Sequence, residues 1–230
     1  MKKDGTLELF LMLLPFCSDV DITVGKNNKL KIKADLKWFY MKNILYKEYD
    51  VPCCVLKQYE EELSKIPLYL LQYYNYYEVK MYITKKSIRN IVKNEIGYDL
   101  GNMDIGGAFI NLPQYLKGYV STRYYGHHYV LLHELGHAID AIEKFYGMGL
   151  EPSLSDVFKK IYKDERAKLF NKQGLAYVQT EKEYWAQCFA LYNIDEEKLK
   201  KLAPRTHGYM KLILESIKLR MKNNTDKIAG

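Results

Sequence analysis

Two histidines and a glutamate form the pattern His-Glu-x-x-His at residues 133–137. On a helix, positions i and i+4 lie on one face, so the imidazoles of His133 and His137 can reach the same metal ion. Glu134 projects about 100° around the helix from His133, where a carboxylate can take a proton from water that the metal has acidified. Imidazole and carboxylate ligands in a three-ligand site with an open position fit zinc. The pattern therefore predicts one catalytic Zn²⁺ per chain, with Glu134 as the general base.

A catalytic zinc site of this type requires a third protein ligand. In one group of His-Glu-x-x-His enzymes a histidine follows a glycine turn, but Asp140 and Glu143 occupy those two positions here. Without the glycine the helix is expected to continue, and Glu143 then points about 240° away from His137. The third ligand is therefore expected to be a carboxylate from a later helix. The candidates are Glu181, Glu183, Glu196 and Glu197.

Glu183 is the best placed of these carboxylates, and Glu181 stays open as the alternative. Glu183 belongs to a helix face of small side chains that could pack closely under the His-Glu-x-x-His helix. Larger apolar side chains of the same segment lie on other faces and are available for the core. The small-residue face consists of Glu183, Ala186, Gln187 and Ala190, and the larger side chains are Trp185, Phe189 and Tyr192.

The elements that must position these residues are indicated by periodicity, caps and breakers. Apolar residues at helical spacing predict a helix over 127–146, and Thr180 can cap a second helix that reaches Tyr192. A strand over 108–112 ends at Pro113, which cannot continue a ladder and so marks a sheet edge. A half-buried strand is predicted over 79–84. Three further helices are predicted over 51–66, 67–74 and 87–94. Another helix is expected to begin at a Ser153-x-x-Asp156 capping pair and to end at about Phe170, and the last to run from Pro204 to Leu219.

The composition is that of an ordinary globular chain, with 230 residues of which 48% are hydrophobic and 27% charged. It excludes wholesale disorder, collagen and coiled-coil arrays. The net charge of +7 predicts solubility and some attraction to anionic surfaces, but nothing about the fold. Four cysteines without Cys-x-x-Cys spacing indicate neither a disulfide framework nor a zinc knuckle, and Cys188 is expected in the core.

The chain is expected to contain an N-terminal extension (1–50), a catalytic domain (51–222) and a polar tail (223–230). Residues 1–18 have the outline of an export signal, although acidic residues interrupt it. Residues 26–37 suit a basic strand or arm on the surface. After the N-terminus no apolar stretch approaches the ~20 residues that a membrane span needs, so none is expected.

Three blocks of the sequence resemble, in the right order, the catalytic domain of anthrax lethal factor and the clostridial Pro-Pro endopeptidases of the same metallopeptidase family. The first block, 133–140, is common to many metallopeptidases. The second block, Tyr177 with 180–186, and the third, 202–206, make the likeness specific. The resemblance covers roughly 65–215. It implies an α+β, zincin-like metallopeptidase domain, with a small mixed sheet whose edge strand lies over the HExxH helix and a mostly helical C-terminal half.

The resemblance also implies roles for individual residues. His133, His137 and Glu183 would ligate zinc. Glu134 would be the general base and proton shuttle, and Tyr177 would hydrogen-bond the oxyanion of the tetrahedral intermediate. The interval from Tyr177 to Glu183 is one residue shorter than in the family pattern, so a structural role for Tyr177 stays open.

Three further features of the resemblance concern the surroundings of the ligands. Asp140 matches an acid that supports a ligand histidine. Gln187 stands where the relatives tend to carry an acid, which changes the charge beside the ligands. The strand over 108–112 would be the edge that pairs with an extended substrate.

The leading hypothesis is a zinc metalloendopeptidase that cleaves an extended peptide or protein, either a lethal-factor-like secreted toxin or a proline-directed protease. The family resemblance favours secretion, with a cytoplasmic protein as the alternative. A non-catalytic binding domain of the same family is the second hypothesis, against which the intact His133, Glu134 and His137 argue. A basic nucleic-acid-binding domain would leave this motif and Glu183 unexplained. We therefore expect a peptide substrate, no nucleic acid and a monomer.

Overall fold

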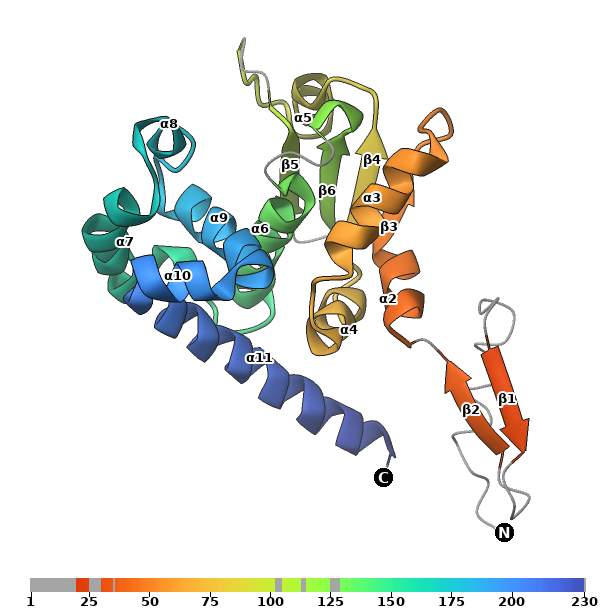
Figure 1. The fold of residues 1–230 in the computed structure, drawn as a ribbon. Helices are drawn as coiled ribbons and strands as arrows, with labels where there is room; N and C mark the ends of the chain where they lie inside the picture. The colour runs from red at the N-terminus through yellow and green to blue at the C-terminus, as the bar shows by residue number, and fades with distance from the viewer. Residues whose placement is uncertain are drawn as a thin grey trace.

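The computed structural model describes residues 20–24, 30–34, 36–101, 105–112, 115–124 and 129–229 (Figure 1). Three sequence predictions lie outside the described residues: the export-signal outline at 1–18, the break at Pro113 and the helix start at His127. In the N-terminal extension, β1 (Val20–Val24) and β2 (Leu30–Ala34) form a separate antiparallel pair.

A four-stranded mixed sheet has the strand order β3-β4-β6-β5. The strands β3 (Leu45–Lys47), β4 (Lys80–Thr84) and β6 (Tyr115–Ser121) are parallel, and β5 (Gly107–Leu112) is antiparallel to β6. Because β5 comes last in this order, it is an edge strand, as the sequence predicted.

Different helices cover the two faces of this sheet. On one face, Met81 and Val120 belong to the main core, to which the helix α6 (Val130–Phe145) also contributes. On the other face, α5 (Ile88–Ile96) packs against Ile110 of β5. The α6 helix therefore lies beneath the sheet and in contact with its edge strand. The other helices of the N-terminal half are α2 (Leu36–Ile44), α3 (Cys53–Leu63) and α4 (Leu68–Tyr76).

The C-terminal half is mostly helical, which confirms the predicted α+β class. The α6 helix packs closely on α9 (Glu181–Ile194) at Gly136, where a Cβ would come within 2.8 Å of the Cα of Ala186. This approach confirms that the small-residue face lies under α6. The remaining elements are the 3₁₀ helices η2 (Thr122–Tyr124) and η3 (Pro152–Leu154) and the helices α7 (Asp156–Leu169), α8 (Lys172–Leu175), α10 (Glu196–Leu202) and α11 (Pro204–Ala229).

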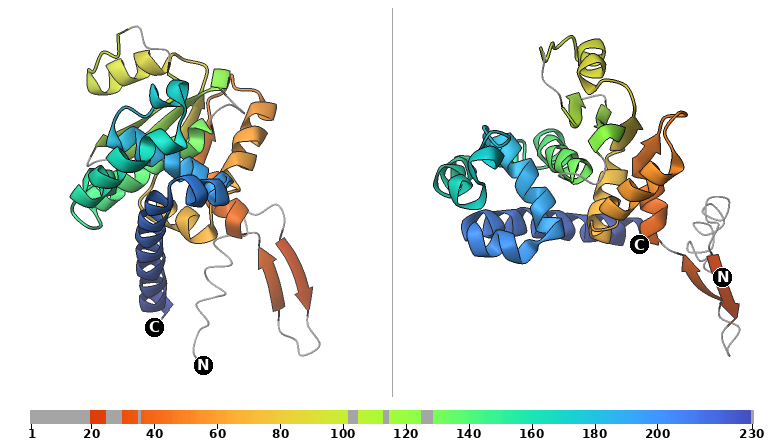
Figure 2. Two further views of the ribbon diagram at one scale, coloured as in Figure 1. Left: turned by 60° about the vertical axis from the view of Figure 1, so that its left-hand side comes forward. Right: turned by 45° about the horizontal axis from the view of Figure 1, so that its top comes forward.

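The boundaries of the domain differ from the prediction at both ends. The N-terminal boundary lies before residue 50, because β3 pairs with β4 and the α2 side chains Met41 and Ile44 are buried in the main core. The last helix, α11, does not end at Leu219 but continues to Ala229, into the predicted polar tail, and packs against α4 (Figures 1 and 2). After Gly208 no proline or glycine stops it before the end of the chain.

One of the two predicted helix caps is confirmed and the other is wrong. Thr180 Oγ1 accepts a hydrogen bond of 3.2 Å from the backbone N–H of Glu183, as predicted for the cap of α9. The cap of α7 is Ser155, whose Oγ accepts from the N–H of Phe158 at 3.1 Å. Ser153 is unavailable for that role because it lies two residues earlier than the cap position, within η3.

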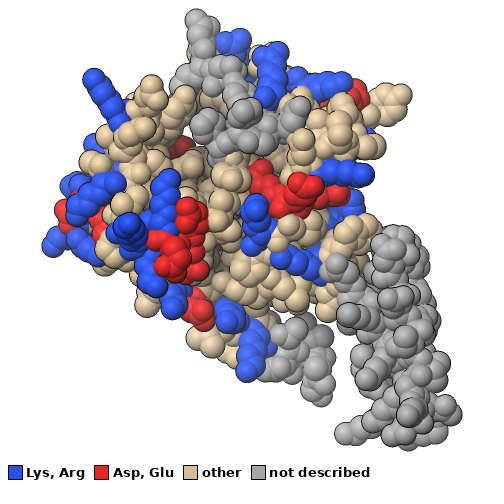
Figure 3. Space-filling model, viewed as in Figure 1, with Lys and Arg blue, Asp and Glu red and all other residues tan. Residues whose placement is uncertain are grey.

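The surface and the cysteines give few constraints on function. Basic and acidic side chains are interspersed on the face shown in Figure 3, and pairs such as Lys200–Glu197 join them. Among the described helices, none is both long and apolar enough to cross a membrane. Cys188 is fully buried, as predicted.

Candidate metal centre

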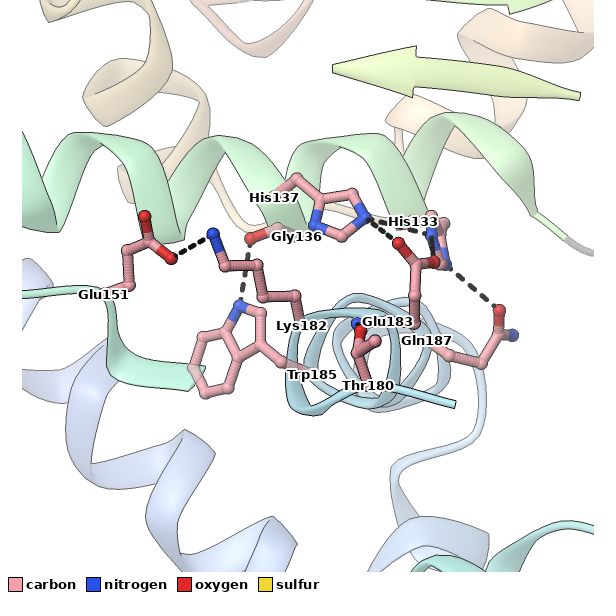
Figure 4. A network of polar contacts seen from close by, with 9 residues as sticks. All are labelled: His133, Gly136, His137, Glu151, Thr180, Lys182, Glu183, Trp185 and Gln187. Atoms are coloured by element: carbon pink, nitrogen blue, oxygen red, sulfur yellow. Dashed lines mark hydrogen bonds and ion pairs between the residues drawn. The ribbon is translucent and has the colours of Figure 1, made fainter. Parts of the chain in front are cut away.

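Three side chains from two helices bring their ligand atoms together. His133 Nε2 lies 3.2 Å from His137 Nε2 and 3.1 Å from Glu183 Oε2, and His137 Nε2 lies 3.5 Å from Glu183 Oε1 (Figure 4). One donor atom from each residue lies within 4.8 Å of the other two. In the part of the chain that the structure describes, no other group of three His, Cys, Asp or Glu residues meets this criterion.

The arrangement of these atoms fits a zinc ion. Two ligands that are each about 2.1 Å from a tetrahedral zinc lie about 3.4 Å apart. Here the two imidazole nitrogens lie 3.2 Å apart, and the two oxygens of Glu183 lie 3.1 Å from the nitrogen of His133 and 3.5 Å from that of His137. Two imidazole nitrogens and one carboxylate oxygen also form the donor set of many catalytic zinc sites. The predicted set of His133, His137 and Glu183 is therefore geometrically competent to hold the ion.

Charge interactions keep the carboxylate of Glu183 in its ionised form. Burial alone would raise its pKa, but hydrogen bonds with His133 and His137 outweigh burial and hold the pKa well below its ordinary value. Burial also disfavours the charged form of His137, yet the hydrogen bond with Glu183 raises the pKa of this imidazole. A carboxylate with a low pKa is ready to bind a cation near neutral pH.

Gln187 fixes the orientation of one ligand histidine. Its Oε1 accepts a hydrogen bond of 3.2 Å from Nδ1 of His133, which leaves the Nε2 lone pair of that ring for a metal. Gln187 thus occupies the supporting position with an uncharged acceptor. Asp140, the other predicted support, is 3% exposed and accepts a hydrogen bond of 3.0 Å from the N–H of Ser153. Burial raises the pKa of Asp140 to about 6, against a favourable charge interaction with His137.

Glu134 lies in a buried position beside the three ligands. Burial raises the pKa of its carboxyl, and the charges of His133 and His137 partly oppose this shift. A Cβ on Gly107, the first residue of β5, would come within 2.6 Å of Glu134 Oε1. The carboxylate therefore lies directly against the backbone of the edge strand, on the side of the sheet that faces α6.

The ligand helices are held in place by contacts from other parts of the chain. Trp185 Nε1 donates a hydrogen bond of 2.9 Å to the carbonyl oxygen of Gly136, which joins α9 to α6 beside the three side chains (Figure 4). At the start of α6, Glu62 from α3 accepts a hydrogen bond of 2.9 Å from the N–H of Leu132. Neither contact was predicted, because the sequence does not indicate which distant backbone group a Trp or Glu side chain will reach.

The other candidate carboxylates lie outside this cluster. Glu143 is fully buried and accepts hydrogen bonds from Tyr73 and Arg220, so it is not directed at the metal site, as predicted. Glu196 accepts from His207 at 2.8 Å, and Glu197 pairs with Lys200 at 3.7 Å. Glu181, the alternative third ligand, is not part of the cluster that contains Glu183.

Tyr177 is placed in the segment between α8 and α9 that leads to the Thr180 cap. Its side chain is 77% exposed, so it is not a core tyrosine. Its backbone N–H donates to the carbonyl of Gly174 at 3.0 Å. The geometry therefore excludes burial in the core as a structural role for Tyr177.

Comparisons with known proteins agree with this fold. The Pro-Pro endopeptidase PPEP-2 from Paenibacillus alvei has a similar structure, with a TM-score of 0.57 over 76% of this chain and 99% of that chain, at 19% sequence identity. The chain thus shares the α+β fold of this endopeptidase. The family model described as anthrax toxin lethal factor, N- and C-terminal domain, matches residues 115–213. The resemblance to the lethal factor family is confirmed over this region, which contains all three candidate ligands. A comparison with curated proteins gives no significant match.

Proposed function

We propose that this chain is a zinc-dependent endopeptidase that hydrolyses a peptide bond in an extended peptide or protein. The observation that carries the proposal is the convergence of His133, His137 and Glu183 beside the buried carboxylate of Glu134, beneath an edge strand. A structural role alone would not require two imidazoles and a carboxylate to bring their donor atoms together at zinc-ligand separations.

In this proposal His133, His137 and Glu183 hold the metal, and Glu134 handles protons. A bound Zn²⁺ would acidify a water molecule and polarise the carbonyl of the scissile bond. Glu134 takes a proton from the attacking water and then donates it to the nitrogen of the leaving segment. Burial raises the pKa of Glu134, which favours this exchange because a proton shuttle works best with a pKa near the working pH.

The substrate is proposed to add to the sheet along β5. In the order β3-β4-β6-β5 this strand has β6 as its neighbour on one side and, among the strands that the structure describes, none on the other. An extended peptide can pair with such an edge through main-chain hydrogen bonds. The contact between Gly107 of β5 and Glu134 brings that edge next to the general base. The likeness to a Pro-Pro endopeptidase supports a preference for proline near the cleaved bond.

Tyr177 is proposed to stabilise the oxyanion that develops on the carbonyl oxygen. A phenol hydroxyl can donate to that charge, and such a donor is worth most when it meets the transition state rather than the substrate. The exposed position of Tyr177 is compatible with a side chain that turns toward a bound substrate.

A combinatorial peptide library that includes Pro-Pro sequences tests the proposal and identifies the substrate class. Zinc-loaded protein should cleave a defined subset of peptides, lose this activity when a chelator removes the metal, and regain it when Zn²⁺ is returned. Mass spectrometry of the products would locate the cleaved bonds. Protein that holds one zinc but cleaves no peptide would instead indicate the non-catalytic binding domain.

A further inference from the structure

A buried carboxylate outside the ligand set joins the two helices that carry the ligands. Glu151, in the segment after α6, is 4% exposed. Its Oε1 lies 2.9 Å from Lys144 Nζ of α6. Its Oε2 lies 2.5 Å from Lys182 Nζ of α9 (Figure 4). Lys182 immediately precedes the ligand Glu183.

In both ion pairs the carboxylate of Glu151 is shielded from water, whereas the lysines are partly exposed. A buried charge that loses its partner is costly, so Glu151 and the two lysines hold one another more firmly than surface pairs do. The pKa of Glu151 agrees with this, because burial would raise it but the ammonium groups of Lys182 and Lys144 lower it. The bridge is therefore a fixed connection between α6 and the first turn of α9.

The first turn of α9 is where fixation matters for metal binding. The side chain of Glu183 is 42% exposed, so burial alone does not define its position. Thr180 caps the turn on one side of Glu183, and Trp185 anchors it to Gly136 on the other. Lys182 adds an attachment to α6 directly beside the ligand.

We propose that Glu151 is a positioning residue for the metal ligand Glu183. By pairing with Lys182, it holds the first turn of α9 at the distance from α6 at which the Glu183 carboxylate meets both histidines. The inference rests on the proposed function, because it takes His133, His137 and Glu183 to be the metal site. The geometry of the bridge from Glu151 to Lys182 does not depend on that function.

Substitution of Lys182 distinguishes a positioning role from a purely electrostatic one, because the two would change the affinity for the metal in opposite directions. Removal of a positive charge near a cation site strengthens cation binding if charge alone matters. Loss of a supporting contact instead lowers metal affinity, typically by about 10- to 100-fold. Lys182→Met is therefore the decisive variant, and Lys182→Arg, which keeps the ion pair, should retain affinity.

The experiment measures the Zn²⁺ affinity of the full chain by competition with a colorimetric chelator. Lys159→Met is the matched control, since Lys159 is 43% exposed and Lys182 is 42% exposed, and each pairs with an acid. Lys182→Met and Glu151→Gln should each weaken binding at least about 10-fold, and the double variant should be no worse, because both remove one interaction. Unchanged or tighter binding by Lys182→Met would overturn the inference.

Hydrogen exchange of the metal-free protein distinguishes failure of this inference from failure of the proposed function. Lys182→Met should speed exchange in the first turn of α9, whereas Lys159→Met should not. Faster exchange in a protein that binds no zinc would support the positioning role and contradict the proposed function. Unchanged exchange and affinity in a zinc-binding protein would contradict only the positioning role.

Discussion

The carboxylate of Glu134 and the backbone of Gly107 lie in contact, so closely that a Cβ on Gly107 would come within 2.6 Å of Oε1 and 2.9 Å of Cγ of Glu134. Gly107 begins the edge strand β5, and Glu134 lies in the first half of α6. The proposed general base and the strand proposed to bind substrate are thus positioned relative to each other by a glycine.

Gly107→Ala should lower kcat by about 10²-fold, because displacement of a catalytic group by about 1 Å can cost that much. Zinc content should not change, because the three atoms nearest to a Cβ at Gly107 belong to Glu134 and Val130 and not to a proposed ligand. Steady-state kinetics and metal analysis measure the two effects. Gly208→Ala is the control, since a Cβ there meets nothing within 4 Å. Equal kcat in the two variants would show that Glu134 does not depend on a bare backbone at residue 107.

Glu183→Ala should weaken zinc binding, whereas Glu181→Ala should leave it unchanged. The carboxylate of Glu183 lies 3.1 Å from His133 Nε2 and 3.5 Å from His137 Nε2, and Glu181 is not part of this cluster. Chelator competition with both variants decides between the two carboxylates that the sequence alone left open. The opposite pattern would exchange their roles.

Tyr177→Phe should lower kcat by about 10²-fold, on the order of 3 kcal/mol, with little change in KM or zinc content. The variant keeps the ring and deletes only the hydroxyl, which is proposed to meet charge that exists in the transition state. Kinetics on a peptide identified from the library measure the split between kcat and KM. Turnover within a few-fold of the parent would remove Tyr177 from the mechanism.

Glu62→Gln should flatten the pH dependence of stability between about pH 5 and 7. Burial raises the pKa of Glu62 from 4.5 to about 7. In this window the folded protein retains a proton that the unfolded chain has released, so the free energy of unfolding falls as pH rises. The loss attributable to Glu62 is on the order of 2 kcal/mol.

Denaturant unfolding of the metal-free protein at several pH values measures this effect. Glu61→Gln is the control, because Glu61 is the exposed neighbour of Glu62 on α3. An equally steep fall in stability in the Glu62→Gln protein would show that the carboxyl of Glu62 does not titrate as described.

The two candidate histidine ligands could be predicted because their placement depends on local helix geometry. The spacing of His133 and His137 places both on one face within a single helical turn. The prediction of Glu183 required only one tertiary contact, the packing of the small side chains of α9 under α6. Gly136 and Ala186 make that contact. Gly107, Glu62 and Glu151 could not be predicted, since each acts through a contact far away in the sequence.

The missed strands have different physical explanations. In β6, Tyr119 and Ser121 are buried as well as Leu116 and Val120, so burial does not alternate along the strand. Gly118 further weakens the pattern, because the side chain of Met81 fills the space of a Cβ there. The strand β3 has 3 residues, too few to show a period of two. Its place in the sheet depends on pairing with β4, which the sequence does not indicate.

Zinc-loaded Glu134→Gln tests the central claim most directly, because Glu134 is proposed to act in the chemical step without binding the metal. The variant should hold about one zinc, as the parent does, and cleave the best library peptide roughly 10³-fold more slowly. Turnover equal to that of the parent at equal zinc content would contradict the proposal that His133, Glu134, His137 and Glu183 form a hydrolytic zinc site.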